Sequence, residues 1–97
     1  MKKSILICIL ALGLSVPALA EDKCKKIETL AEVVMDARQR GVPASKMMEL
    51  VDGNPLVRAI VLDSFKTSTY STESVRRKVI REFKDKWYIW CIKKMED

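Results

Sequence analysis

Two cysteines near opposite ends of the chain, Cys24 and Cys91, constrain its fold more than any other feature. In a small exported domain, an even number of cysteines is typical of a disulfide framework, and two cysteines allow only one pairing. The bridge would close a loop over residues 24–91 and stabilise the fold by about 4 kcal/mol in the chain-entropy description. A reactive or metal-binding thiol pair is the alternative, but the C-x-x-C spacing typical of such pairs is absent.

The beginning of the chain has the three parts of a secretory signal peptide. Residues 1–3 include two lysines, residues 5–16 are almost entirely apolar, and Ala18, Leu19 and Ala20 form an A-x-A cleavage site. The apolar stretch is shorter than the ~20 residues that a membrane-spanning helix needs, which disfavours a retained anchor. The sequence therefore predicts a chain that leaves the cytosol.

This signal peptide, or leader, determines the compartment and the domain organisation that we expect. We expect cleavage after Ala20, with a signal peptide over residues 1–20 and one helical domain over residues 21–97. The product would be periplasmic, in an oxidising compartment where disulfides persist, and it would not be an integral membrane protein. Cys8 lies within the apolar part of the leader and is removed with it, which leaves the pairing of the other two cysteines.

Apolar residues recur at the three- and four-residue spacing of helices through most of the exported domain. The pattern predicts an all-α fold of four helices, over residues 22–40, 45–51, 55–66 and 73–94. Gly41 is expected to end the first helix, Ser45 to cap the second and Asn54 to cap the third. The third helix is apolar on all sides, which predicts a central place in the core. The disulfide would join the first helix to the last, and these two helices would run antiparallel to each other.

Histidine is absent from the 97 residues, which excludes histidine-based acid–base catalysis, histidine-containing triads and histidine-ligated metals. The chain also has no glycine-rich phosphate loop and no calcium-binding loop. We therefore expect no enzymatic activity, no metal site and no cofactor. The net charge of the whole chain is +5, and +3 remains once Lys2 and Lys3 are removed with the leader, which leaves 16 basic and 13 acidic residues. Because an exported domain does not routinely meet nucleic acid, this charge indicates a partner that is another protein or an anionic envelope component.

The positive charge is concentrated in the last predicted helix. Arg77, Arg81, Lys84 and Tyr88 recur at i, i+4, i+7 and i+11, beside the apolar face of that helix. Three cations and a phenol in a row could receive carboxylate or phosphate groups, so this stripe is the candidate partner-binding surface. The alternative is an ordinary solvated helix face, lightly paired with neighbouring acidic residues.

Two further features have both a structural and a functional interpretation. Residues 87–92 combine two tryptophans, a tyrosine and two isoleucines with Cys91. They could pack around the disulfide, or leave an exposed patch for a partner, a membrane or a second copy of the chain. Arg38 falls on the apolar side of the first helix, where a cation must reach solvent or find a partner. Asp63, among the apolar residues of the third helix, is the predicted partner in a buried polar pair.

One combination of residues is recognisable as a set: Cys24, Leu30, Ala31, Met35, the element Arg38-Gln39-x-Gly41, a later tyrosine, and Cys91 in an aromatic terminal helix. With this set, the chain resembles a family of small exported bacterial and prophage proteins of unassigned activity. The resemblance covers almost the whole exported domain and implies export, helices and one disulfide, without any catalytic residue. The architecture is also similar to that of small periplasmic acid-stress chaperones.

These observations favour a protein-interaction or inhibitor-type binding module that uses the basic face of the last helix. One alternative is an acid-stress chaperone that exposes apolar surface at low pH. Another is a protein that binds the envelope or membrane surface through the last helix. A homodimer is compatible with each of these functions.

Overall fold

The computed structural model describes the backbone of residues 9–96 and the side chains of residues 22–96. Within this part the chain forms four helices and no strand: α2 (Ile9–Gln39), α3 (Ala44–Met48), α4 (Pro55–Ser64) and α5 (Glu73–Glu96). The all-α, four-helix fold expected from the apolar periodicity is confirmed. The start of the predicted signal peptide, including Cys8, lies outside the described residues.

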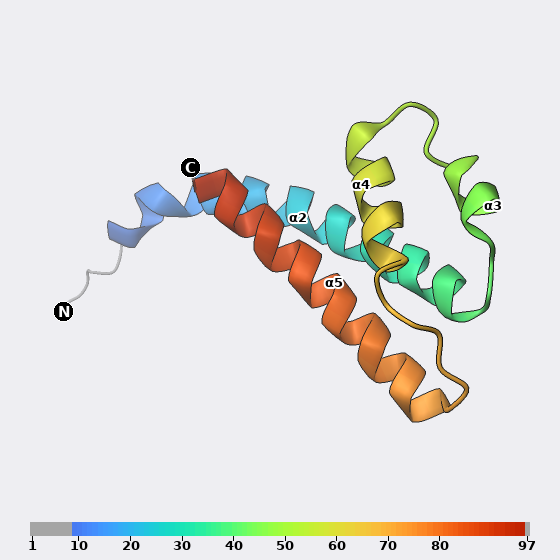
Figure 1. Cartoon of the computed structure of the whole chain (residues 1–97). Coiled ribbons are helices and arrows are strands. Elements are labelled where there is room, and N and C mark those ends of the chain that lie inside the picture. Colours follow the sequence, from blue (N-terminus) through green and yellow to red (C-terminus); the bar gives the residue numbers. More distant parts are fainter. Residues whose placement is uncertain (1–8, 97) are drawn as a thin grey trace.

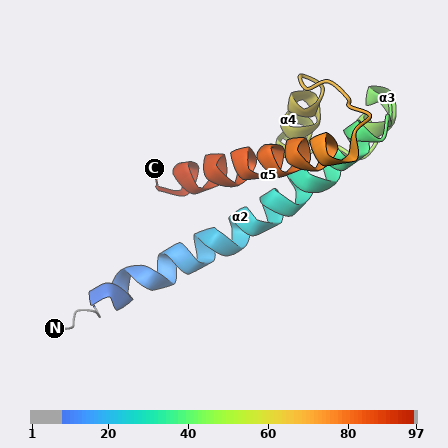
Figure 2. The ribbon, with the colours of Figure 1, turned by 90° about the horizontal axis from the view of Figure 1, so that it is seen from below.

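The two long helices, α2 and α5, run antiparallel, and α3 and α4 lie beside the C-terminal part of α2 (Figure 1). Figure 2 shows the same arrangement from below, with the first turns of α2 extending beyond the C-terminal end of α5. The first helix was expected from residue 22, but in the whole chain it begins at Ile9. The part of the leader that the structure describes, residues 9–20, contains several leucines and alanines, which are strong helix formers, so the helix includes these residues. None of the helices in residues 9–96 combines the length and the apolar character needed to cross a bilayer.

The ends of the helices follow local sequence signals. The Oδ1 atom of Asn54 accepts hydrogen bonds from the backbone N–H groups of Leu56 (2.9 Å) and Val57 (3.1 Å), which confirms the predicted cap of α4. At the end of α2, Gly41 has a φ of +88°. Its N–H donates to the carbonyl of Arg38, and the next residue donates to the carbonyl of Ala37, which is the Schellman pattern of a helix C-terminus.

The start of α3 differs from the expectation. Pro43 occupies the N-cap position, and no side chain caps this helix. Ser45 therefore lies inside the helix, and the prediction that it caps α3 is wrong. The extended backbone that proline favours at residue 43 sets the helix start by itself. The helix also ends at Met48 instead of residue 51, ahead of a turn in which Asp52 and Gly53 both have positive φ.

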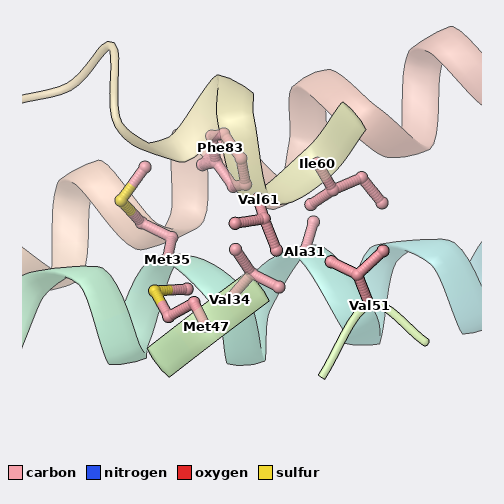
Figure 3. Packing of buried hydrophobic residues seen from close by; sticks show 8 residues of the cluster. All are labelled: Ala31, Val34, Met35, Met47, Val51, Ile60, Val61 and Phe83. Carbon is pink, nitrogen blue, oxygen red and sulfur yellow. The ribbon is translucent and has the colours of Figure 1, made fainter. Parts of the chain in front are cut away.

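The core lies where all four elements meet (Figure 3). Its buried members are Ala31, Val34, Met35, Met47, Val51, Ile60, Val61 and Phe83. α4 was expected to be buried all round, but only one side of it is, and Leu62 on the other side is 47% exposed. A chain of this size has too few elements to cover both sides of its third helix, so apolar surface stays open there.

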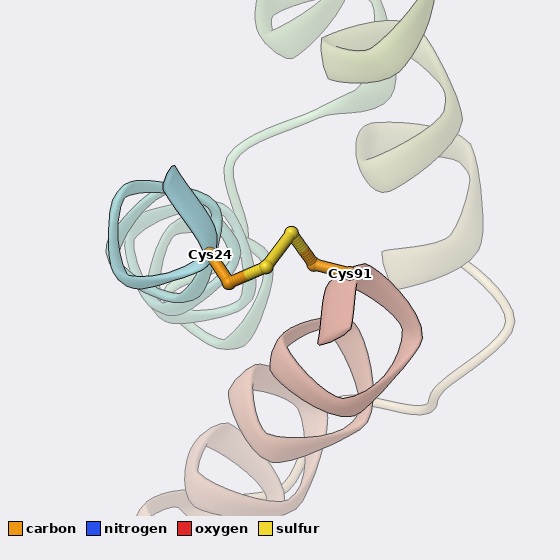
Figure 4. Close-up of a disulfide and its surroundings, with 2 residues drawn as sticks. All are labelled: Cys24 and Cys91. Atoms are coloured by element: carbon orange, nitrogen blue, oxygen red, sulfur yellow. A yellow bond between two sulfur atoms is a disulfide. The ribbon is translucent and has the colours of Figure 1, made fainter. Parts of the chain in front are cut away.

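The predicted disulfide is confirmed between Cys24 and Cys91, which are 67 positions apart in the sequence and 5.5 Å apart between Cα atoms. It joins α2 to α5 near the C-terminal end of α5, and both cysteines are buried (Figure 4). Because disulfides persist in oxidising environments, this bridge is consistent with such a compartment. It ties together the first and last helices, as the positions of the cysteines predicted.

Candidate functional site

A groove of about 710 Å³ runs between α2 and α5. Its walls are made by Glu32, Val33, Asp36, Arg77, Ile80, Arg81, Lys84 and Asp85. Three of the four residues of the predicted binding stripe, Arg77, Arg81 and Lys84, therefore line one groove. Tyr88 is half-buried one helical turn further along α5, and it is not among the residues that line the groove.

The charges of the groove are balanced across its two walls. The three cations come from α5, whereas Glu32 and Asp36 come from α2, and Asp85 adds a third carboxylate. Nζ of Lys84 lies 3.5 Å from a carboxylate oxygen of Glu32, and this pair bridges the two helices. The stripe is therefore one half of a dipolar groove, in which carboxylates stand opposite the cations. Sequence reasoning missed the acidic half because it lies on a helix far away in the sequence.

The middle of the groove holds its unpaired groups. Arg77 is paired with Glu73 at 3.1 Å, while Arg81 and Asp85 form no ion pair with any residue in the described part of the chain. Val33 is 59% exposed on the α2 wall. An unpaired cation, an unpaired carboxylate and an open apolar side chain thus share one concave surface.

Arg38 and Asp63 do not pair with each other, so the predicted buried polar pair is wrong. Arg38 donates from Nε (3.1 Å) and Nη2 (3.0 Å) to the backbone carbonyl of Thr67, and its guanidinium lies 4.4 Å from the ring centroid of Phe65. Both contacts belong to the segment that follows α4. Here the partners of the guanidinium are a backbone carbonyl and an aromatic ring. Neither is a charged side chain, so the search for an opposite charge in the sequence did not find them.

Asp63 faces α5 instead. It accepts a hydrogen bond from Nε1 of Trp87 at 3.0 Å and lies 2.6 Å from Nζ of Lys86. A looser contact of 3.8 Å joins it to Lys66, in the turn directly after α4. The carboxylate is only 16% exposed and has cationic and neutral donors around it, so its role is to fix α5 against α4.

Gln39 is the polar residue whose role sequence reasoning missed. Its side chain is buried, with Nε2 donating to the carbonyl of Ser68 (2.8 Å) and Oε1 accepting from the N–H of Tyr70 (2.9 Å). Together with Arg38, it holds residues 67–70, the segment that leads from α4 to α5. The Arg38-Gln39-x-Gly41 element is therefore a structural clamp. The only sequence signal for it was a pair of polar residues, Arg38 and Gln39, that is separated by one residue from a helix-ending glycine.

Residues 87–92 divide between the two interpretations that the sequence left open. Cys91 is buried and Trp87 is half-buried, as packing around the disulfide requires. Ile89 and Trp90 are exposed. The two indole rings lie 5.1 Å apart at 64°, in an edge-to-face arrangement. The segment is thus core on one side and open surface on the other.

Fold and site together define a small all-α domain that is closed by one disulfide and carries a mixed-charge groove between its first and last helices. In residues 22–96 the structure holds no group of three or more potential metal ligands. Comparisons with protein-family models, with curated proteins and with solved structures find no match to this chain.

Proposed function

We propose that the protein is an exported binding module that docks a protein partner in the groove between α2 and α5. One observation carries the proposal: the two walls of the groove bear net charges of opposite sign, and an exposed apolar side chain lies on one of them. Arg81 on α5 is unpaired among the described residues, acidic side chains stand on α2, and Val33, also on α2, is open to solvent.

This charge arrangement favours a protein over a polyanion. Polyphosphates and anionic saccharides would meet Glu32, Asp36 and Asp85 as well as the three cations, so repulsion would offset the attraction. A protein surface offers both signs of charge and apolar side chains within a few ångströms. Complementary charges on such a partner would fix its orientation, while contact with Val33 would contribute apolar burial.

Three features support export as part of the proposal. The leader has the form of a signal peptide, the two remaining cysteines form a buried disulfide, and the chain resembles small exported bacterial and prophage proteins. Intact-mass measurement of the chain recovered from the periplasm tests this part. The expected mass lacks residues 1–20 and carries one disulfide, and a chain that retains its leader would contradict it.

The docking surface is tested by site-specific photocrosslinking in cells that export the protein. A photoreactive residue at Val33 is expected to give one discrete adduct, whereas the same residue at Arg58, exposed on α4, is expected to give none. The partner in the adduct is then identified, purified and titrated with the wild-type chain and with Arg81→Glu. Reversal of this charge is expected to weaken binding at least about tenfold.

Unchanged affinity of Arg81→Glu would remove the groove from consideration. Equal adducts from Val33 and Arg58 would do the same, because they would show contact without a preferred surface. Arg58→Glu, a reversal of the same charge on an exposed side chain of α4 that does not line the groove, serves as the matched control.

A further inference from the structure

A second surface lies between α4 and α5, and both helices present it with the same spacing. On α4 the residues at i, i+3 and i+4 are Ala59, Leu62 and Asp63, and Lys66 follows at i+7 in the turn directly after the helix. On α5 the residues with that spacing are Lys86, Ile89, Trp90 and Lys93. Residues with this spacing share one side of a helix. We refer to these eight residues as the tryptophan face.

The two halves of the tryptophan face meet at a shallow groove of about 360 Å³. Ala59 and Asp63 line it from α4, Lys66 from the turn after α4, and Lys86, Trp87 and Trp90 from α5. The hydrogen bond from Trp87 to Asp63 fixes the base of the groove, and the edge-to-face contact with Trp87 orients Trp90. The geometry of the face is therefore set by the fold, without help from a partner.

Its outward chemistry is apolar in the centre and positive at the rim. Leu62 is 47%, Ile89 52% and Trp90 39% exposed, so the two helices that form this face leave three large apolar side chains open to solvent. Lys66, Lys86 and Lys93 are exposed around them. The carboxylate of this face, Asp63, is turned inward and held by Trp87 and Lys86. Lys66 also contacts this carboxylate, at 3.8 Å, so Asp63 offsets one of the three positive charges and the face keeps a net excess of positive charge.

We propose that the tryptophan face docks on the surface of a bilayer that contains anionic phospholipids. Tryptophan has an apolar ring system with one polar N–H and is favoured at the boundary between lipid headgroups and acyl chains. Lysines with flexible apolar stems reach headgroup phosphates while their stems stay in contact with apolar surface. The positive rim is complementary to such a surface. This proposal concerns another face than the α2–α5 groove, and it stands independently of the function proposed for that groove.

Vesicle binding tests the proposal. The processed chain, with residues 1–20 removed so that the apolar leader does not contribute, is mixed with vesicles of phosphatidylcholine alone or of phosphatidylcholine with an equal part of phosphatidylglycerol. It is expected to cosediment with the anionic vesicles at low salt and to be released as added salt screens the charges. Brominated lipid chains are expected to quench tryptophan fluorescence, and Trp90→Phe is expected to lose most of that quenching.

Two matched double variants locate the surface. Lys66→Glu with Lys93→Glu reverses two charges on the rim, and we expect it to lower partitioning at least about tenfold. Lys46→Glu with Lys78→Glu makes the same charge change on exposed side chains elsewhere and is expected to retain much more of the binding. Circular dichroism of both variants shows that the helices are intact.

Three outcomes would overturn the proposal. The first is a failure of the wild-type chain to bind anionic vesicles at low salt. The second is an equal loss in both double variants, which would mean attraction by net charge without a defined face. The third is a dimer in light-scattering measurements that Ile89→Ser dissociates, because the face would then be covered by a second copy of the chain.

Discussion

The side-chain amide of Gln39 pairs with the backbone on either side of Thr69: it donates to the carbonyl of Ser68 and accepts from the N–H of Tyr70. The carbonyl of Tyr70 in turn accepts from Nε of Arg76 at 2.6 Å. One residue of the connecting segment is thus held by the last turn of α2 and by the first turn of α5. This link sets where α5 begins relative to α2, and so where the basic wall of the groove lies.

Gln39→Ala is expected to destabilise the fold by about 2–3 kcal/mol. The change removes two hydrogen bonds and leaves the carbonyl of Ser68 and the N–H of Tyr70 without their partner, in a partly buried place. Urea unfolding followed by circular dichroism measures the loss. Gln39→Glu is a comparison of matched size. Its carboxylate still accepts from the N–H of Tyr70 but repels the carbonyl of Ser68, so this variant is also expected to be destabilised. A fully stable Gln39→Ala variant would contradict the clamp.

Arg38→Ala is expected to lower the free energy of unfolding by about 1–2 kcal/mol, because it removes both hydrogen bonds to Thr67 and the contact with Phe65. Arg40→Ala is the comparison. Arg40 is well exposed and pairs with Asp36 one turn away at 2.9 Å, a type of pair that contributes about 0.3–0.5 kcal/mol. Equal unfolding free energies for the two variants would show that Arg38 is not a structural residue.

Much of the backbone could be predicted because its signals are local. The apolar spacing marks helices, Asn54 and Pro55 mark the start of α4, and Gly41 marks the end of α2. The disulfide followed from counting the cysteines that remain after the predicted signal peptide. The helix signals depend on neighbouring residues, and the cysteine pairing had only one possibility. Predicting them therefore needs no knowledge of the tertiary structure.

The side-chain partners were harder to predict because they depend on which helix faces lie opposite each other. Asp63 and Arg38 are of opposite charge, yet Asp63 points to α5 and Arg38 to the segment after α4. The acidic wall of the groove comes from α2, so the charge balance around Arg81 was invisible from α5 alone. The exposure of Leu62 likewise reflects how few elements there are to cover α4.

Trp87→Phe is expected to destabilise the fold by about 1–2 kcal/mol. Phenylalanine keeps much of the apolar contact but lacks the N–H that donates to Asp63, so the poorly exposed carboxylate loses one of its partners. Trp90→Phe is the control at a more exposed ring on the same helix, where only part of an edge-to-face contact is lost. Urea unfolding of the two variants checks the order, and a larger loss for Trp90→Phe would contradict the assigned roles.

Replacing both cysteines, Cys24→Ala with Cys91→Ala, is expected to cost about 4 kcal/mol because the unfolded chain regains the freedom that the long loop removed. Small domains have total stabilities of about 5–15 kcal/mol, so this loss brings the fold close to its limit. Urea unfolding measures it, with the reduced wild-type chain as a second route to the same state. If the double variant matched the oxidised wild-type chain, the bridge would be dispensable for the fold.

Gly41→Ala is expected to lower stability by about 1–2 kcal/mol, and the reason is purely conformational. Gly41 has a φ of +88°, and a Cβ placed there would meet no atom within 4 Å, so steric contact does not contribute. The expected loss therefore comes from holding a residue with a Cβ in the left-handed region, which glycine adopts without steric strain. Gly53, with a φ of +75° and equally open surroundings, should show a similar loss. The two losses, measured by urea unfolding, are expected to agree within about 0.5 kcal/mol. A much larger loss at Gly41 would instead mean that the turn after α2 also positions the Arg38 and Gln39 side chains on residues 67–70.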